Sequence, residues 1–340
     1  MDWTYWLFLL LKMVIVLGWA LLMVPLLIYM ERKVLADFQA RIGPNRVGPV
    51  GILQPIADGI KLLLKEDLLP AKADKYVHFL APLVAVVPAF LALSVVPFGP
   101  ITHKETGTGY FVTHVNVGLL FILGLGSLNV YAITLAGWAS NNKYSLMGGI
   151  RSSAQMISYE LSMGLALIPV LMIAGSLDLV RIVENLGVAK GEGLSRLLLT
   201  VPLTISFVIY CICGVAETNR APFDFPEAES ELVAGFHTEY SSMRFALFFL
   251  SEYVNMITVC ALATTLFLGG WKFPFVPETG PFPLLVFLAK VMIGLYGYMW
   301  MRATWPRLRY DRLMKLGWTR LLPIALANII LTGILMIAFQ

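Results

Sequence analysis

Charged side chains are scarce in this sequence. Asp, Glu, Lys and Arg make up 14% of its 340 residues, whereas hydrophobic residues make up 58%. A soluble domain of this length would carry about 25% charged residues. The composition therefore excludes an ordinary soluble enzyme and is typical of a chain that crosses a membrane several times.

Motifs that hold metals or nucleotides are also lacking. The cysteines Cys211, Cys213 and Cys260 are too few and too scattered for a metal site, which favours small buried hydrophobic residues instead. There is no CxxC, no histidine pair at ligand spacing and no glycine-rich phosphate loop. We therefore expect no metal, iron–sulfur cluster, flavin or nucleotide in this chain, and no binding of nucleic acid.

Long apolar runs, in contrast, are abundant. Eight of them approach the ~20 residues that the core of a bilayer requires, and spanning helices tolerate the prolines that some contain. The sequence predicts an all-α, polytopic integral membrane protein in which residues 1–340 form a single membrane domain. The predicted spans are residues 6–30, 77–98, 117–138, 154–175, 197–216, 245–268, 282–301 and 321–339.

The distribution of basic residues predicts the orientation of these spans. Most of the 25 Lys and Arg residues lie in the loops that follow the first, third, fifth and seventh spans. Loops rich in Lys and Arg stay on the cytoplasmic side. Both termini are therefore expected on the opposite side, where the loops hold few basic residues: Lys104, Arg181, Lys190, Arg196 and Lys272.

The first cytoplasmic loop, residues 31–75, is too long for a plain connection. Its apolar residues recur at helical spacing, and polar residues occupy the opposite stripe, which predicts an amphipathic helix in the membrane interface. One interpretation is a surface anchor, which periodicity alone favours. The other is the wall of a cavity, with Asp58 and Lys61 facing the polar head of a ligand.

Carboxylates gather in the loop of residues 217–239 and in the spans beside it. Acids in a membrane are costly to ionise, so a group of them indicates proton transfer or cation binding. In a helix, Glu227 and Glu231 would share a face. Pairing with Arg151, Arg244 or another subunit is the alternative for part of the set: Glu160, Glu217, Asp224, Glu227, Glu229, Glu231, Glu239 and Glu252.

Three long segments carry a resemblance to a known family. They read ERKVLADFQARIGPNRVGPVGILQPIADGIKLLLKED, GWASNNKYSLMGGIRSSAQMISYE and AETNRAPFDFPEAESELVAGFHTEYSSMRFALFFLSEY. In this order, and with eight spans, the chain closely resembles the H subunit of proton-pumping NADH:quinone oxidoreductase (respiratory complex I), the counterpart of mitochondrial NADH dehydrogenase subunit 1. The resemblance covers essentially the whole chain.

The resemblance implies a function and a set of site residues. It implies a subunit with no catalytic residues or redox centre of its own, which forms the membrane side of a quinone chamber and couples quinone reduction to proton translocation. Arg32, Arg41, Asp58 and Phe249 would contact the quinone, which is the substrate. The implied proton-coupling acids are Glu160, Glu217, Asp224, Glu227, Glu229, Glu231 and Glu252.

The resemblance also implies partners and a location. FMN and iron–sulfur clusters would belong to partner subunits of the peripheral arm, which the segment 43–51 and the acidic loop would dock. Other membrane-arm subunits and lipid would surround the chain in a bacterial inner membrane. One departure concerns Asn129, where some relatives carry a carboxylate. Because an amide does not exchange protons as a carboxyl does, water or another acid would have to bridge any proton path there.

Three other interpretations remain open on the sequence. The chain could be the related membrane subunit of a multisubunit hydrogenase, although the complete first-loop motif argues against this. It could be a relative fed by ferredoxin, which assays with electron donors would identify. A stand-alone proton-coupled transporter belongs to another class, and such transporters usually show internal repeats, which are not found here.

Overall fold

The computed structural model describes residues 3–103, 108–109, 113–187, 194–224, 233–274, 276–277 and 279–338. Within them, eight helices are long and apolar enough to cross a membrane. Each corresponds to a predicted span, so the all-α polytopic fold is confirmed. The spanning helices are α1 (Trp3–Phe38), α3 (Lys75–Val95), α4 (Gly118–Ala139), α5 (Lys143–Ala174), α7 (Leu194–Glu217), α9 (Ser242–Phe267), α10 (Phe282–Thr304), and α11 (Tyr310–Leu316) continuing through a π-helical turn (Gly317–Leu321) into α12 (Leu322–Ala338).

The observed bounds extend well beyond the predicted ones at three helix ends. Helix α1 continues to Phe38, helix α5 already begins at Lys143, and the last spanning helix already begins at Tyr310. Hydropathy missed these extensions because they carry charged and other polar residues and leave the apolar part of the chain. The extension of α5 is nevertheless buried on one face, where Ser145, Gly148 and Ser152 meet their neighbours.

The connectors contain more structure than the sequence indicated. The predicted amphipathic helix is confirmed as α2 (Gln54–Leu64). The connector of residues 178–196 contains helix α6 (Leu179–Gly187). Buried Asp178 begins α6 by accepting a hydrogen bond from the Val180 amide at 3.0 Å. A two-stranded antiparallel sheet, β1 (Ile101–His103) and β2 (Thr108–Gly109), lies in the connector after α3.

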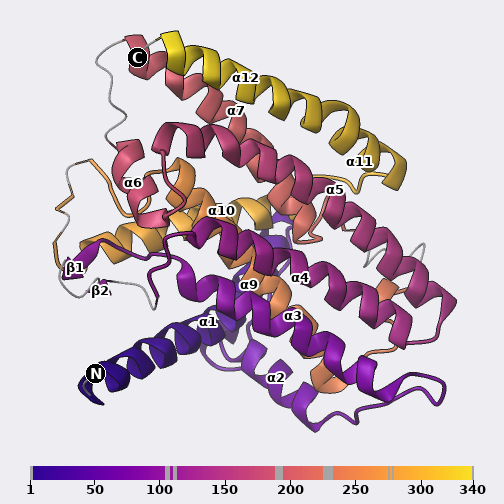
Figure 1. Ribbon diagram of the computed structural model, residues 1–340. Coiled ribbons are helices and arrows are strands. Elements are labelled where there is room, and N and C mark those ends of the chain that lie inside the picture. The colour runs from indigo at the N-terminus through magenta and orange to yellow at the C-terminus, as the bar shows by residue number, and fades with distance from the viewer. Residues whose placement is uncertain are drawn as a thin grey trace.

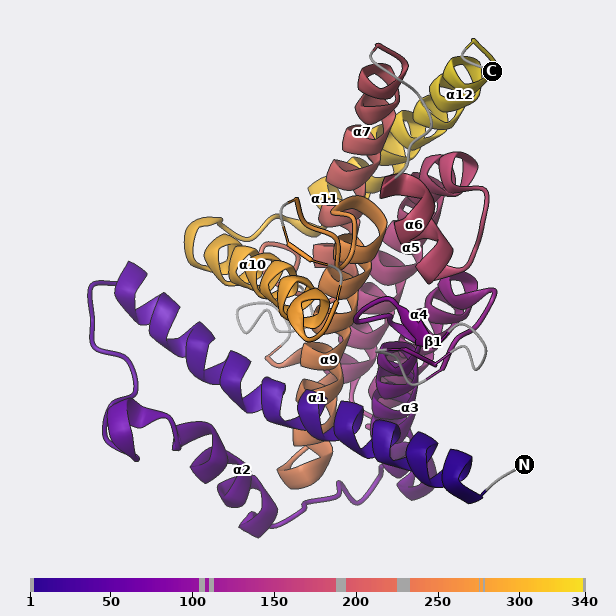
Figure 2. The same ribbon diagram turned by 90° about the vertical axis from the view of Figure 1, so that its left-hand side faces the viewer.

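The helices divide into a packed bundle and an outlying pair. Helices α3, α4, α5, α7, α9 and α12 pack side by side, with α12 along α5 and α7 (Figure 1). Helix α1 crosses in front of this bundle, with α2 below it and α10 above it (Figure 2). Only 17% of the apolar window of α1 is buried, against 56% for α9. A loosely packed α1 leaves room between itself, α2 and α9.

The end of the acidic loop is seated directly on α5. A short 3-10 turn (Gly235–His237) meets the buried face of α5, where a Cβ atom on Gly148 would lie 2.7 Å from the Cα of Gly235. Only glycine fits at such a distance. The Ser145 hydroxyl also donates to the Phe236 carbonyl at 2.9 Å. These contacts fix residues 235–237 beside the start of α9.

Candidate functional site

A large cavity lies between α1, α2 and α9, with Arg302 of α10 at its edge. Its volume is about 600 Å³, within the range of small-molecule sites. Most of the wall is apolar, with Val24 and Ile28 from α1, Leu62 from α2, and Phe249 and Leu250 from α9. A long apolar group could therefore lie in this space without losing contact with hydrocarbon.

Polar side chains gather at one part of the cavity wall. Arg32 Nη1 of α1 donates to Asp58 Oδ2 of α2 at 2.6 Å. Gln54 Nε2 donates to Asp58 Oδ1 at 3.3 Å, and Lys61 Nζ lies 3.6 Å from the same oxygen. These contacts join the two helices across the cavity and offer a few directed groups to a polar head.

The environment of Asp58 keeps its carboxyl ionised. Burial alone would raise its pKa, but the hydrogen bond and charge of Arg32, together with Gln54 and Lys61, outweigh burial and hold the pKa below its ordinary value. A lowered pKa means that these interactions are fully present above the unfolded value. They weaken only as the pH falls through the lowered folded value. Asp58 is therefore an anion throughout the neutral range.

Glu31 is the second acid at the cavity. It is 5% exposed, at the end of the apolar part of α1. Its Oε2 accepts from the Tyr253 hydroxyl at 2.6 Å, its Oε1 lies 3.3 Å from Arg220 Nη1, and Arg302 donates to the same oxygen. The buried carboxylate is thus held by two cations and a phenol. Such pairing is what a buried charge requires.

Arg220 connects Glu31 to a second acid, Glu252. Its Nε lies 2.6 Å from Glu252 Oε1 of α9, and its guanidinium carbon lies 4.4 Å from the centre of the Tyr253 ring. Burial would lower the pKa of Arg220, but Glu252, Tyr253 and Glu31 raise it well above its ordinary value. The cation is permanent, so a change at Glu31 alters the field at Glu252.

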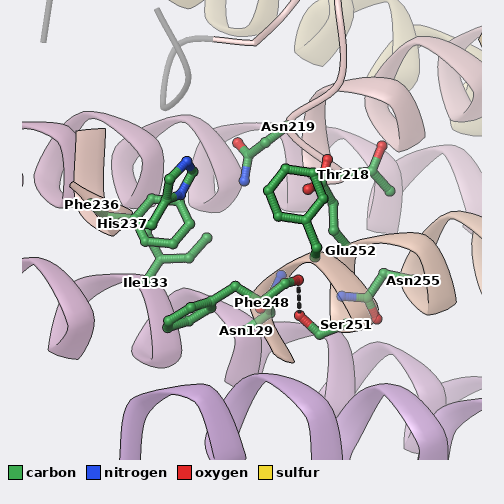
Figure 3. A pocket seen from close by; sticks show the side chains of 11 residues that line it. Asn129, Ile133, Thr218, Asn219, Phe236, His237, Phe248, Ser251, Glu252 and Asn255 are labelled. Atoms are coloured by element: carbon green, nitrogen blue, oxygen red, sulfur yellow. Dashed lines mark hydrogen bonds between the residues drawn. The ribbon is translucent and has the colours of Figure 1, made fainter. Parts of the chain in front are cut away.

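Two small cavities continue from Glu252 into the bundle. The first is lined by Glu252, Asn219, His237 and Ser251 among others, and Figure 3 shows these side chains around one space. The second reaches Glu217 and Tyr210. Their volumes, about 30 and about 40 Å³, each exceed the ~10–15 Å³ that a water molecule needs. Three polar residues line both cavities: Asn129, Thr218 and Asn255.

Glu217, which lines the second small cavity, lies close to Glu160. Glu217 Oε2 is buried without a hydrogen-bond partner among the described residues, and the carboxyl lies within electrostatic reach of Glu160. Glu160 accepts a hydrogen bond from the Ser127 hydroxyl. A carboxyl in the membrane without a nearby cation is costly to ionise. This pair is therefore suited to holding and releasing a proton.

Some of the predicted site residues line the large cavity and others do not. Arg32, Asp58 and Phe249 line the large cavity. Arg41 lies outside it, exposed, and donates to Gln39 Oε1 at 2.7 Å. Asp224 is buried and pairs with Arg307 at 3.1 Å. Three further acids fall outside the described residues: Glu227, Glu229 and Glu231.

Sequence reasoning missed three residues of this site. Glu31, Tyr253 and Arg302 line the cavity together, although the sequence offered only the position of Glu31 directly after an apolar run. The acidic loop also has more cations nearby than its own Arg220. Arg302 and Arg307 reach its surroundings from the end of α10 and the segment after it. Helix α2 is a cavity wall, and it also keeps apolar residues such as Ile60 and Leu64 exposed, as a surface anchor would.

Comparison with known proteins agrees with the resemblance. A family model described as NADH dehydrogenase matches residues 11–333. The second of the H subunits of NADH-quinone oxidoreductase in Geobacter metallireducens is 50% identical over 98% of this chain and 96% of its own length. The first H subunit of Geobacter sulfurreducens is 50% identical over 97% and 95%, and the H subunit of Frankia casuarinae is 50% identical over 96% and 72%. The chain therefore belongs to the NADH dehydrogenase family, among the H subunits of NADH-quinone oxidoreductase.

Proposed function

We propose that this chain forms the membrane-side quinone chamber of an NADH-quinone oxidoreductase and couples quinone reduction to proton translocation. The observation that carries the proposal is the continuity of one route. An apolar cavity opens between α1, α2 and α9, its polar part contains Glu31, and Glu31 joins Arg220 and Glu252. Small polar cavities continue from Glu252 to Glu217.

The two parts of the cavity suit the two parts of a quinone. The isoprenoid tail needs an apolar sleeve, which Val24, Ile28 and Phe249 help to form. The head group needs few polar groups, and Arg32 with Asp58 supplies both a donor and an acceptor. Arg41 would act outside this cavity, on the path of the head group towards the partner subunits.

Coupling would operate through the charges along the route. Reduction of a quinone to a quinol consumes two electrons and two protons, and the electrons would come from iron–sulfur clusters of partner subunits. Negative charge or proton demand near Glu31 would alter the field at Arg220 and Glu252. The pair Glu217 and Glu160 would respond by binding or releasing a proton. Asp224 and, in the loop outside the described residues, Glu227, Glu229 and Glu231 would extend the set.

The orientation and partners are part of the same proposal. The chain would lie in a bacterial inner membrane, and the bias of basic residues supports an orientation with both termini on the non-cytoplasmic side. The loops before α2 and before α9 would dock the peripheral arm, which carries FMN and the iron–sulfur clusters. The other exposed apolar faces would meet further membrane-arm subunits and lipid. Names of the relatives support this assembly over a hydrogenase, a ferredoxin-linked enzyme or a lone transporter.

Substitution of Asp58 tests the chamber. In Asp58→Ala, Arg32 loses its acceptor across the cavity, so quinone reductase activity is expected to fall about tenfold or more, equivalent to about 1.4 kcal/mol. NADH oxidation by an artificial acceptor, which takes electrons upstream, should stay near the parent value. The control is Asp37→Ala, which removes an exposed carboxylate of α1 outside the cavity. Equal loss of both activities in Asp58→Ala, or no loss of either, would contradict the assignment.

A further inference from the structure

A histidine outside the proposed route is held in an unusual contact. His78 of α3 is 0% exposed, and its Nδ1 lies 2.8 Å from Nη1 of Arg244 in α9. The imidazole stacks on Tyr240 with ring centroids 3.9 Å apart and planes inclined by 7°. The packed ring has little freedom to turn away from the guanidinium.

The chemistry of this contact fixes the state of the histidine. A guanidinium only donates hydrogen bonds, so Nδ1 must act as the acceptor and any ring proton must sit on Nε2. In the doubly protonated imidazolium both nitrogens are donors. A cation would then face the Arg244 cation at a distance of 2.8 Å. The observed hydrogen bond is therefore compatible only with neutral His78.

Arg244 also contacts the connector that follows α2, and so links His78 to the end of that helix. Its Nε lies 2.9 Å from Asp67 Oδ2, in the connector that follows α2. Two nearby serines bind the same end of α2. The Ser242 hydroxyl lies 2.9 Å from the carbonyls of Leu62 and Lys65. Ser241 Oγ accepts a hydrogen bond from the Leu68 amide. The start of α9 therefore clamps the C-terminal end of the helix that walls the large cavity.

The charges around His78 come from every side of the clamp. Arg244 belongs to α9, Asp67 to the connector after α2, and Glu239 to the segment before α9, where its carboxylate accepts from Asn142 at 2.7 Å. Asp74 at the start of α3 uses its side chain on two backbone amides of its own helix. Burial raises the pKa of Tyr240 above its ordinary value, so the stacked phenol stays neutral. Among the residues that the structure describes, Arg244 is the one cation in contact with His78.

We propose that His78 is a pH-sensing positioning residue that, while neutral, holds Arg244 and through it the α2 wall of the cavity. Protonation from the cytoplasmic side converts the hydrogen bond into repulsion and releases Arg244, which loosens the clamp on α2. Acidification therefore weakens the clamp, and alkaline pH restores it. The clamp itself stands on these contacts alone, whereas its effect on turnover rests on the proposed function of the cavity.

Hydrogen–deuterium exchange of the assembled complex tests the clamp without any need for quinone. After correction for intrinsic rates, peptides covering residues 62–74 and 238–247 are expected to exchange at least about threefold faster at pH 6 than at pH 8. In His78→Asn the amide oxygen accepts from Arg244 at both pH values, so this difference should vanish. Arg244→Gln, in which protonated His78 meets no cation, should also reduce it. The control His114→Asn should behave as the parent, because His114 contacts Asp178 elsewhere.

Two results would overturn the inference. The first is an exchange ratio near one in the parent, or an unchanged ratio in His78→Asn. The second concerns turnover: quinone reduction, normalised to the artificial-acceptor rate at each pH, should decline less from pH 8 to pH 6 in His78→Asn than in the parent. Identical declines beside a pH-dependent exchange would overturn the link from the clamp to the cavity.

Discussion

Replacement of Arg220 by Met is expected to disable the complex. The substitution removes the cation that lies 2.6 Å from Glu252, and it leaves Glu31 with Arg302 and the Tyr253 hydroxyl. Removing one partner of a buried ion pair typically costs about 3–5 kcal/mol, because the remaining charge stays buried. We expect either a much lower content of assembled complex in the membrane or a loss of quinone reduction of at least about 10²-fold, which corresponds to about 2.7 kcal/mol of barrier.

A second substitution separates these two effects. In the double variant Arg220→Met with Glu252→Gln, the carboxylate that lost Arg220 is replaced by a neutral amide, so assembly should recover while quinone reduction stays low. The control is Arg309→Met, since the Arg309 side chain is 80% exposed and pairs only loosely with Asp311 at 3.5 Å. Assembly is followed by native gels and turnover by quinone reduction. Parent-like turnover of assembled Arg220→Met would show that Arg220 is not a link in the route.

Glu217→Gln is expected to stop coupled turnover while preserving the fold. Glutamine keeps the shape of the buried side chain but cannot exchange a proton. If Glu217 and Glu160 hold the transferred proton, quinone reduction and proton translocation should fall together by about 10²-fold, or about 2.7 kcal/mol. Both are measured on inverted membrane vesicles, with the artificial-acceptor rate as a measure of intact complex.

An exposed acid provides the comparison for Glu217. Glu184 lies on the exposed side of α6, away from the cavities, and Glu184→Gln should behave as the parent. A Glu217→Gln complex that keeps the parent rate and the parent proton-to-electron ratio would make Glu217 a structural residue. In that case the small cavities beyond Glu252 would have no part in coupling.

The spans and α2 could be predicted because their signals are local. Hydropathy over about 20 residues and helical spacing of apolar residues depend only on neighbours in the chain. Helix α6 was missed because it has only nine residues and because apolar and polar residues alternate along it. Its burial depends on packing against α5 and α9. The extension of α5 was missed for a related reason. Its small polar residues are buried by contact with α4 and the turn at Gly235–His237, which no local pattern reveals.

The contacts within the candidate site were even harder to predict from local sequence patterns. Asp58 and Phe249 were identified through motifs, and both line the cavity. The partners of Glu31 lie 189, 222 and 271 residues away along the chain, in Arg220, Tyr253 and Arg302. Contacts over such separations follow from the tertiary fold and produce no recognisable residue spacing in the sequence. The acids indicated proton chemistry from the sequence alone. Their pairing with Arg220, Arg302 and Arg307 became visible only in the structure.

Asn129, which has an amide where a proton path could use a carboxyl, lies on the proposed route. The amide lines both small cavities, beside Thr218 and Asn255, between Glu252 and Glu217. Each cavity exceeds the volume of a water molecule and offers polar partners. The proposed route therefore does not depend on a carboxylate at this position. Water bound by these side chains would bridge the two acids.

Photoaffinity labelling of the assembled complex tests the central claim most directly. A quinone with a photoreactive group on its tail, reduced by the complex in the dark, is irradiated and its cross-linked peptides are identified. We predict labelling of α1 between Leu21 and Leu35 or of α9 between Met243 and Tyr253, competed by excess unmodified quinone. Labelling confined to other helices or other subunits, with the probe still reduced, would contradict a quinone chamber between α1, α2 and α9.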